Sequence, residues 1–292
     1  MKPNIICEFS EYVIRCLCEL DFEEVQSQNL IAIGGSYLII IKINLQTKQQ
    51  EIKKKIESNK NINKIIIIKE LKKLITCDDI GNIFIYNITF DNEIININTV
   101  LMKEKCHKSY INSIFYLKND EILVSKSYED ETIKFWNILN NDLKAISSFG
   151  GVKSSIYNKS FEDKNNILLV GDKKGIKAFS HENKKINNCF IYHDDLFGEI
   201  ISIKSIDDTD YFICGRAYGF CSVFLLKEKS IRKVNIFRNN NLYTFNDSSK
   251  DRFYITDIAI IKTSPKIGKI LISSFDKTVK IYDYNLKENN FI

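Results

Sequence analysis

A repeat of roughly 45 residues constrains this chain of 292 residues more than any other feature. Short apolar runs with alternating side chains recur along the sequence, and the third run of each set closes on a bulky residue. These closing residues are Ile43, Tyr86, Trp136, Phe179, Leu225 and Tyr282, separated by gaps of 43, 50, 43, 46 and 57 residues. Alternation is typical of half-buried strands, and such a period is typical of stacked sheets. The sequence therefore predicts six similar all-β units.

The clearest unit lies at His107–Asn137. Two alternating runs, Ile111–Leu117 and Ile122–Ser125, flank a Lys-Asn-Asp turn, and a third run at Thr132–Ile138 follows another polar turn. Alternating runs joined by short polar turns indicate an antiparallel meander. A weaker, more polar run follows most of the third runs, as expected for a strand at a solvent-facing edge. Each unit is therefore expected to contain four strands.

This stretch resembles one blade of a WD-repeat β-propeller. His107 precedes the first strand, Asp130 lies six residues before Trp136, and the third strand ends in Phe-Trp-Asn. The resemblance implies a buried network in which the carboxylate accepts from the imidazole and a hydroxyl links the imidazole to the indole. The second strand would supply that hydroxyl, from Ser125 or Ser127.

Two other units match the same motif in part. Asp276 and Tyr282 occupy the corresponding positions in the last unit, whereas the fifth unit keeps His193 but lacks the Asp and the aromatic residue. A His, Ser and Asp set is also the composition of a hydrolase triad. Its order along this chain is that of a repeat and not that of a nucleophile-bearing turn. We therefore expect these residues to hold blades together.

The resemblance implies one domain over residues 1–292, an all-β propeller of six four-stranded blades, one fewer than is common in the family. Stacked blades bury both faces of each sheet and leave only short edges. The last blade, however, has three strands before the chain nearly ends. We expect the run Asn4–Phe9 to supply its fourth strand and close the ring, as the N-terminal strand does in WD-repeat proteins. The alternative is that Asn285–Ile292 forms this strand.

In this family, partners usually bind the face formed by the turns between second and third strands and the connections into first strands. Exposed aromatic and arginine side chains are the types enriched at binding hot spots. The connection Arg238–Asp251 is long, and such loops in compact domains are often functional. The alternative for each aromatic residue is packing against a neighbouring blade. The residues expected to bind a partner are Tyr110, Tyr128, Phe197, Arg216, Tyr218, Tyr243 and Phe275.

The sequence contains no pattern for cofactor or metal chemistry. Its eight cysteines form no Cys-x-x-Cys pair, and no phosphate-binding glycine motif is present. We therefore expect no cofactor, no metal and no catalysis; the enzymatic alternative uses the acidic residues Asp195, Glu199 or Asp257. No apolar run approaches the ~20 residues of a membrane span. The expected compartment is the cytosol or the nucleus.

Residues 48–73 carry nine lysines and three glutamates, whereas the whole chain has a net charge of +5. A basic patch favours nucleic acid or an acidic partner, but lysines also protect an edge strand from pairing. No arginine or aromatic residue is interleaved, which weakens base stacking as a role. The sequence therefore favours a non-catalytic protein-interaction scaffold, a subunit of a multiprotein assembly. The alternative is an RNA-associated propeller in a ribonucleoprotein or ribosome-assembly complex, binding through Lys48–Lys73.

Overall fold

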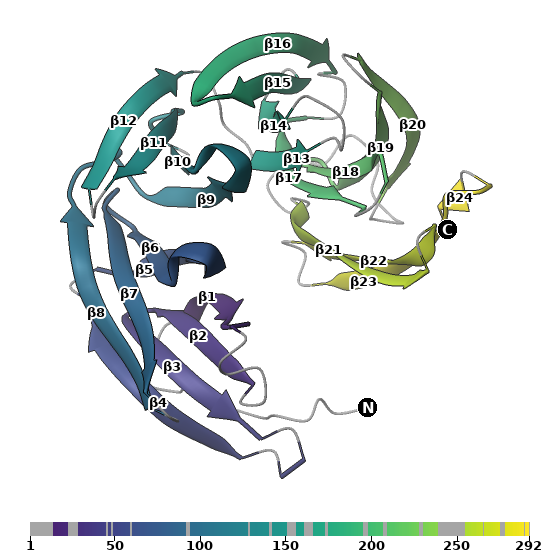
Figure 1. Ribbon diagram of the computed structural model, residues 1–292. Helices are drawn as coiled ribbons and strands as arrows, with labels where there is room; N and C mark the ends of the chain where they lie inside the picture. Colours follow the sequence, from purple (N-terminus) through teal and green to yellow (C-terminus); the bar gives the residue numbers. More distant parts are fainter. Residues whose placement is uncertain are drawn as a thin grey trace. The chain divides into compact units, whose positions relative to one another are not determined.

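The fold was described from a computed structural model. The residues described are 14–22, 29–44, 46–47, 49–58, 60–91, 94–127, 129–139, 142–150, 156–160, 166–172, 175–194, 198–206, 209–227, 230–238, 255–264, 266–274, 278–288 and 290–291. They form six four-stranded antiparallel sheets, in each of which strands adjacent in the chain are adjacent in space (Figure 1). The predicted all-β class and the six four-stranded propeller blades are confirmed.

The chain forms two compact units, Met1–Gly150 and Gly151–Ile292, with three blades in each. That residues 1–292 make one domain stays a prediction. No helix in the described ranges has the length and apolar character needed to cross a membrane.

The first unit contains blades one to three. Blade one consists of β1 (Ile14–Glu19), β2 (Leu30–Gly35), β3 (Tyr37–Ile43) and β4 (Gln50–Glu57). Blade two consists of β5 (Ile62–Ile68), β6 (Lys73–Asp78), β7 (Ile83–Asp91) and β8 (Ile94–Lys103). Blade three consists of β9 (Ile111–Leu117), β10 (Ile122–Ser127), β11 (Ile133–Leu139) and β12 (Asp142–Phe149). The short 3-10 turns η2 (Lys69–Leu71) and η3 (Lys118–Asp120) join the first two strands of blades two and three.

The second unit contains blades four to six. Blade four consists of β13 (Ile156–Ser160), β14 (Asn166–Asp172), β15 (Gly175–Glu182) and β16 (Lys185–His193). Blade five consists of β17 (Ile200–Ser205), β18 (Tyr211–Arg216), β19 (Phe220–Lys227) and β20 (Ser230–Arg238). Blade six consists of β21 (Ile255–Ser264), β22 (Ile267–Ser274), β23 (Val279–Asn285) and β24 (Asn290–Phe291).

The last blade corrects one expectation. Its fourth strand is β24, which pairs with Tyr284 and Asn285 of β23, so the alternative C-terminal strand occupies this edge. The chain reverses there in a tight turn, because the Asn285 side chain accepts a hydrogen bond from the Lys287 N–H at 3.1 Å. The run Asn4–Phe9 lies outside the described residues.

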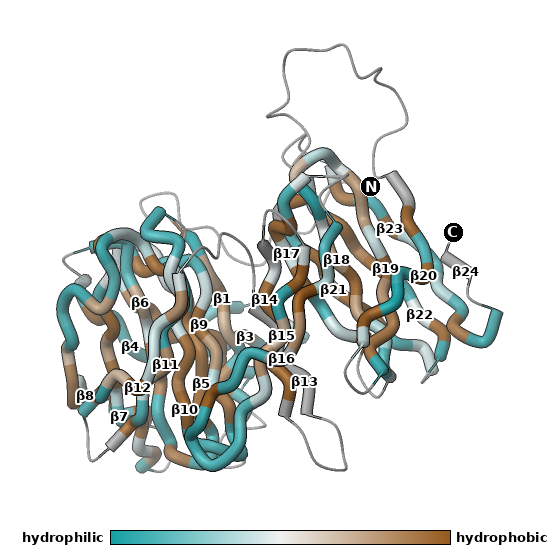
Figure 2. Tube along the Cα trace, turned by 90° about the horizontal axis from the view of Figure 1, so that it is seen from above, coloured by the Kyte–Doolittle hydropathy of each residue, from teal (hydrophilic) through white to brown (hydrophobic). Residues whose placement is uncertain are grey.

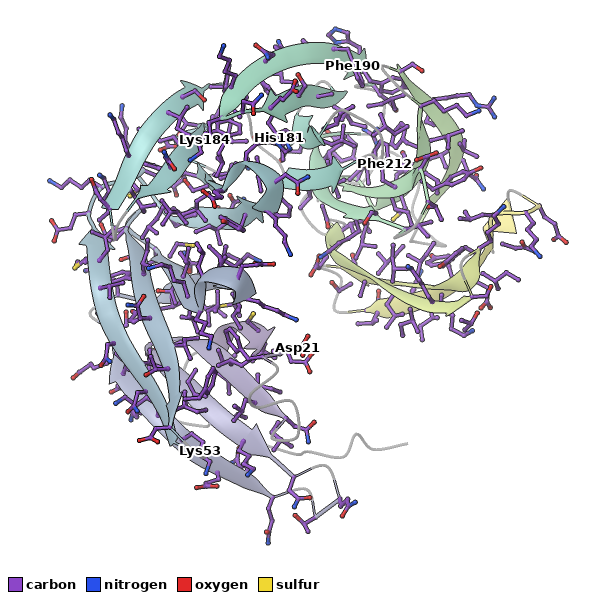
Figure 3. The ribbon with its side chains drawn as sticks, viewed as in Figure 1. Asp21, Lys53, His181, Lys184, Phe190 and Phe212 are labelled. Carbon is purple, nitrogen blue, oxygen red and sulfur yellow. The ribbon has the colours of Figure 1, made fainter. Side chains whose placement is uncertain are left out.

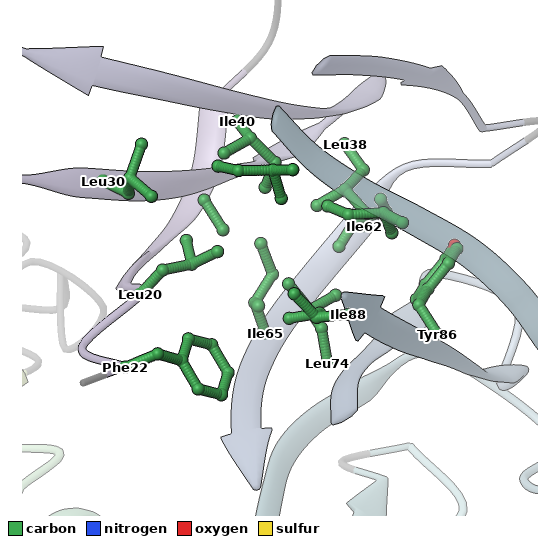
Figure 4. Packing of buried hydrophobic residues seen from close by; sticks show 13 residues of the cluster. Leu20, Phe22, Leu30, Leu38, Ile40, Ile62, Ile65, Leu74, Tyr86 and Ile88 are labelled. Carbon is green, nitrogen blue, oxygen red and sulfur yellow. The ribbon is translucent and has the colours of Figure 1, made fainter. Parts of the chain in front are cut away.

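The core of the first unit lies between neighbouring blades. Figure 4 shows the cluster between blades one and two, where Leu38 and Ile40 of β3 lie near Ile62, Ile65 and Leu74 of blade two. Fully burying one such side chain contributes about 1.5–3 kcal/mol. The first strands β1, β5 and β9 are in contact in that order. The unit is therefore a stack of sheets that fixes the turns at both ends of each blade.

The second unit is built in the same way. Its first strands β13, β17 and β21 are in contact in that order. Phe212 of β18, labelled in Figure 3, stacks on Phe224 of β19 with ring centroids 5.2 Å apart. Hydrophobic residues are concentrated along the strands of this unit and hydrophilic residues at many of its turns (Figure 2).

Candidate partner-binding surface

A hydrogen-bonded network ties together the strands of blade three. Trp136 Nε1 donates to Ser125 Oγ at 2.7 Å, and Ser125 Oγ lies 2.7 Å from His107 Nε2. His107 Nδ1 lies 3.1 Å from Asp130 Oδ2. The structure thus brings together the four residues that the motif predicts. Ser127, the other candidate hydroxyl, bonds instead to Ser109 Oγ at 2.8 Å.

The protonation states in this network follow from burial and hydrogen bonding. Burial lowers the pKa of His107 to about 4, against the opposing effect of Asp130. Burial alone would raise the pKa of Asp130, but hydrogen bonds from Thr132 and from the Lys108 N–H lower it to about 2. A carboxylate can only accept, so the neutral imidazole carries its proton on Nδ1 and accepts from Ser125 through Nε2.

Ser125, His107 and Asp130 have the spacing of a catalytic triad, but a substrate cannot reach the Ser125 hydroxyl. Ser125 is 0% exposed. Its oxygen already accepts the Trp136 indole N–H, so a substrate carbonyl has no route to it. The geometry supports the structural role of the network.

The matching positions of blade six are described only in part. Tyr282 lies on β23, opposite Ile270 of β22, and packs against the core of this blade. Burial raises the pKa of its hydroxyl. Asp276 lies outside the described residues.

Blade five contains a different network, and it corrects the placement of Arg216 on the exposed surface. The Arg216 side chain is fully buried at the end of β18. Its Nε donates to Ser222 Oγ at 3.0 Å, and its Nη2 donates to Asp194 Oδ2 at 2.9 Å. Its Nη1 donates to two backbone carbonyls at 3.1 Å. Lys233 of β20 donates to the same Asp194 oxygen at 2.9 Å.

Asp194 is the residue that the sequence prediction missed. It follows directly after His193, the residue that the motif assigned to this blade. His193 is exposed at the end of β16, whereas Asp194 is buried. Asp194 and Arg216 are 22 positions apart in the sequence, so no local sequence pattern indicates that they pair.

Two turns between second and third strands present large apolar side chains at the same position. In blade two, Ile80 is 45% exposed, and Gly81 follows it with φ +93°. In blade five, Tyr218 is 42% exposed, and Gly219 follows it with φ +74°. Glycine adopts this left-handed conformation at little cost. Both turns therefore hold one side chain outward on a fixed frame.

The other predicted surface residues divide into two groups. Tyr110, in the connection into β9, is half-buried. Tyr128, Phe197, Tyr243 and Phe275 lie outside the described residues. Their role in partner binding stays a prediction, as does that of Tyr110 and Tyr218.

A pocket of ≈ 630 Å³ lies within the first unit, beside the turn that carries Ile80. Phe84 and Tyr86 of β7 line it, with their rings stacked at a centroid distance of 6.5 Å. Met102 of β8, directly opposite Phe84 across the strand pair, also lines it and is 45% exposed. Of these residues only Tyr86 was singled out from the sequence, and only as the closing residue of a third run, because the pocket joins short segments that carry no common motif.

The lysine run of residues 48–73 is partly engaged in contacts within the chain. Lys53 of β4, labelled in Figure 3, pairs with Glu51 at 2.9 Å. Lys55 lies 4.0 Å from the centroid of the Tyr37 ring. Lys69 pairs with Asp21. These contacts lower the number of ammonium groups that a phosphate backbone could engage.

Of the acidic residues of the enzymatic alternative, the structure describes Asp257 and Glu199. Asp257 is exposed and accepts from Ser202 Oγ at 3.3 Å and from the Ile258 N–H at 2.8 Å. Glu199 is half-buried ahead of β17, and Asp195 lies outside the described residues. In the part of the chain that the structure describes, no three His, Cys, Asp or Glu side chains gather to hold a metal ion.

Comparisons with known proteins identify the fold. No protein-family model matches the chain, and a search of curated proteins gives no match. Solved structures of WD40-repeat proteins do match it. The WD40 repeats of RRP9 match with a TM-score of 0.67 and 14% identity, over 97% of this chain and 80% of that chain. U3-55K matches with a TM-score of 0.64 and 15% identity, over 94% and 78%.

A third match is Sqt1 from Chaetomium thermophilum, solved bound to the N-terminus of the ribosomal protein L10. Its TM-score is 0.64 at 11% identity, over 90% of this chain and 71% of that chain. At these identities the likeness concerns the fold alone, and the fold of this chain is that of the WD40-repeat β-propellers.

Proposed function

We propose that this protein is a non-catalytic interaction scaffold, a subunit of a multiprotein assembly that binds its partners at the blade turns. The observation that carries the proposal is the repeated turn frame of blades two and five. Each frame holds one large apolar side chain, Ile80 or Tyr218, in solvent on a rigid sheet. Side chains held in this way lose little conformational entropy on binding.

Two further observations support a scaffold. The residues that could have formed a catalytic triad in blade three are consumed by hydrogen bonds among themselves. One solved structure with the same fold, Sqt1, is bound to the N-terminus of another protein. A partner that offers a peptide segment is therefore the kind of partner we propose here.

We place this scaffold in the cytosol or the nucleus. The six cysteines whose side chains are described are free thiols. Burial raises the pKa of Cys106 to about 12 and that of Cys16 to about 11, which keeps both protonated and unreactive. Such thiols suit a reducing compartment.

The test compares two exposed side chains at opposite ends of blades in the second unit. Tyr218→Ala changes a turn between second and third strands, and the control Ile267→Ala changes the first residue of β22, next to the turn between first and second strands. The two side chains are 42% and 40% exposed, so neither change should unfold the protein. Tagged wild-type and variant proteins are recovered from native extract, and each bound partner is quantified by mass spectrometry.

We expect Tyr218→Ala to lower the yield of a specific partner by about tenfold or more, as for a binding hot spot. The Ile267→Ala variant should retain that partner. Equal partner yields for both variants, at unchanged melting temperature, would contradict partner binding at the turn of blade five.

A further inference from the structure

The pocket beside Ile80 has one apolar wall and a fixed frame. Phe84 and Tyr86 form a stacked aromatic wall, and the exposed side chains of Ile80 and Met102 extend the apolar surface. Its volume of ≈ 630 Å³ lies in the usual range of ligand pockets, roughly 300–1,000 Å³. Such a wall can take up a large apolar side chain of a partner.

A hydrogen-bonded turn fixes the backbone beside the pocket. Asp78 Oδ1 accepts the Asn82 N–H at 2.7 Å and the Ile80 N–H at 3.1 Å, and Asp78 Oδ2 accepts from Asn82 Nδ2 at 2.7 Å. Asn82 Oδ1 in turn accepts the Lys105 N–H at 2.9 Å, which ties the turn to the connection into blade three. A pocket formed in advance does not lose binding energy to ordering.

The connection packs directly against the turn at Gly81. The His107 N–H donates to the Gly81 carbonyl at 3.1 Å. A Cβ placed on Gly81 would lie 2.3 Å from the His107 carbonyl oxygen. The turn of blade two and the buried network of blade three therefore share one rigid junction beside the pocket.

Charges of both signs line the pocket. Five exposed charged side chains contribute to the lining: Glu57, Lys60, Glu104, Lys105 and Lys108. Among the described residues none of these five has an ion-pair partner, so their charges are available to a ligand. A phosphate or another strongly charged ligand of one sign would meet like charges beside its counter-charges. A peptide that carries an apolar side chain with charged neighbours of both signs fits this lining better.

The pocket also borders two edge strands. Glu57 ends β4, and Met102 lies near the end of β8; each strand pairs on one side only within its sheet. An edge strand presents unpaired backbone N–H and C=O groups on its outer side, and extended peptides bind such groups. Backbone and side-chain chemistry both point to an extended chain as the occupant.

We propose that this pocket binds a short extended peptide segment of a protein partner. A large apolar side chain of the peptide lies against Phe84, Tyr86 and Met102, and its charged neighbours pair with the lysines and glutamates of the lining. The proposal rests on the proposed scaffold function and names the chemistry of one partner.

The test uses a random peptide library displayed on phage, selected against the full chain. The chain contains two methionines, Met1 and Met102, so isotope labelling of the methionine methyl group gives one reporter signal inside the pocket. We expect selected peptides to contain a large apolar residue near charged ones and to shift the Met102 methyl signal in a saturable titration. Met102→Glu should weaken these peptides by about tenfold or more.

Ile146→Glu is the matched control. Ile146 lies on β12, the edge strand of blade three, and is 37% exposed against 45% for Met102. This variant should bind the peptides as the wild type does. A library that yields no binder, or binders that leave the Met102 signal unmoved, would overturn the proposal. If the native partner is lost with Tyr218→Ala but retained with Met102→Glu, the pocket proposal fails and the scaffold function stands.

Discussion

In blade three a neutral imidazole links the Ser125 hydroxyl to the Asp130 carboxylate, whereas in blade five a guanidinium links the Ser222 hydroxyl to Asp194. The connection into the first strand supplies the basic group, His107, in blade three. The corresponding connection supplies the acidic group, Asp194, in blade five. The incoming connection thus supplies the base in blade three and the acid in blade five.

Blades three and five have the same kind of buried link, but only the link of blade three has the residues of the WD-repeat motif. Blades three and five each contain a buried link between the incoming connection and the second and third strands. In blade three a chain of mostly neutral groups makes this link, and in blade five a buried ion pair makes it. The physical costs of the two solutions differ, because a buried charge without its partner is far less stable than a buried neutral group.

The largest expected effect is that of Asp194→Ala, which leaves the Arg216 guanidinium buried and without its carboxylate. We expect a loss of about 3–5 kcal/mol in the free energy of unfolding, measured by chemical denaturation. Asp283→Ala is the control, because Asp283 forms an ion pair with Lys269 while its own side chain is 71% exposed. A cost for Asp194→Ala as small as that of the control would show that the blade-five cluster is not held by its charges.

Acid should weaken blade three through His107. Its folded pKa of about 4 lies below its ordinary value of 6.5, so the stability gained by keeping it neutral is complete above pH 6.5. This stability is lost as the pH falls toward 4, by up to about 3 kcal/mol. Asp130, with a pKa of about 2, adds its own loss only below its ordinary value of 3.8.

The acid effect is measured by denaturation at a series of pH values. His107→Gln removes the titrating group, so its free energy of unfolding should change less between pH 6.5 and 4 than that of the wild type. Parallel pH profiles for the two proteins would assign the acid sensitivity to other groups.

His107→Ala should cost about 1–3 kcal/mol, because Asp130 and Ser125 each lose a buried hydrogen-bond partner. The measurement is chemical denaturation at pH 7. A smaller cost than that of Asp194→Ala is the direct test of the difference between the two networks. If the two costs are equal, the chemical distinction between the blades has no energetic consequence.

Lys233→Met should have the smallest effect, at most about 1 kcal/mol. Lys233 pairs with Asp194, but its side chain is 28% exposed and Arg216 still neutralises the carboxylate. A cost near that of Asp194→Ala would mean that Lys233, and not Arg216, is the essential cation of the cluster.

The strand plan and the network of blade three follow from local patterns. Alternation over a few residues indicates strands, and the recurrence of closing residues such as Tyr86 and Trp136 indicates blades. His107, Asp130 and Trp136 were found because the motif fixes their spacing. In each case the signal lies within one blade, where sequence distance and spatial distance are closely related.

The remainder depends on contacts that no local pattern carries. An arginine at a turn is usually exposed, so Arg216 was placed on the surface; its burial depends on Asp194, which follows a different blade in sequence. The pocket lining at Phe84 and Met102 consists of ordinary strand residues until two strands bring them opposite one another. The sequence analysis favoured Asn4–Phe9 for the fourth strand of blade six, whereas a tight turn at Asn285 brings β24 beside β23.

The turns at Gly81 and Gly219 have a consequence for how binding specificity can change. In both, the glycine fixes the backbone, while the preceding residue, Ile80 or Tyr218, contributes its exposed side chain to the surface. Substitution of that residue alters what a partner meets without altering the blade. Under the proposed function, recognition can therefore diverge one codon at a time in a gene whose folding constraints stay the same, through exchanges at these two positions.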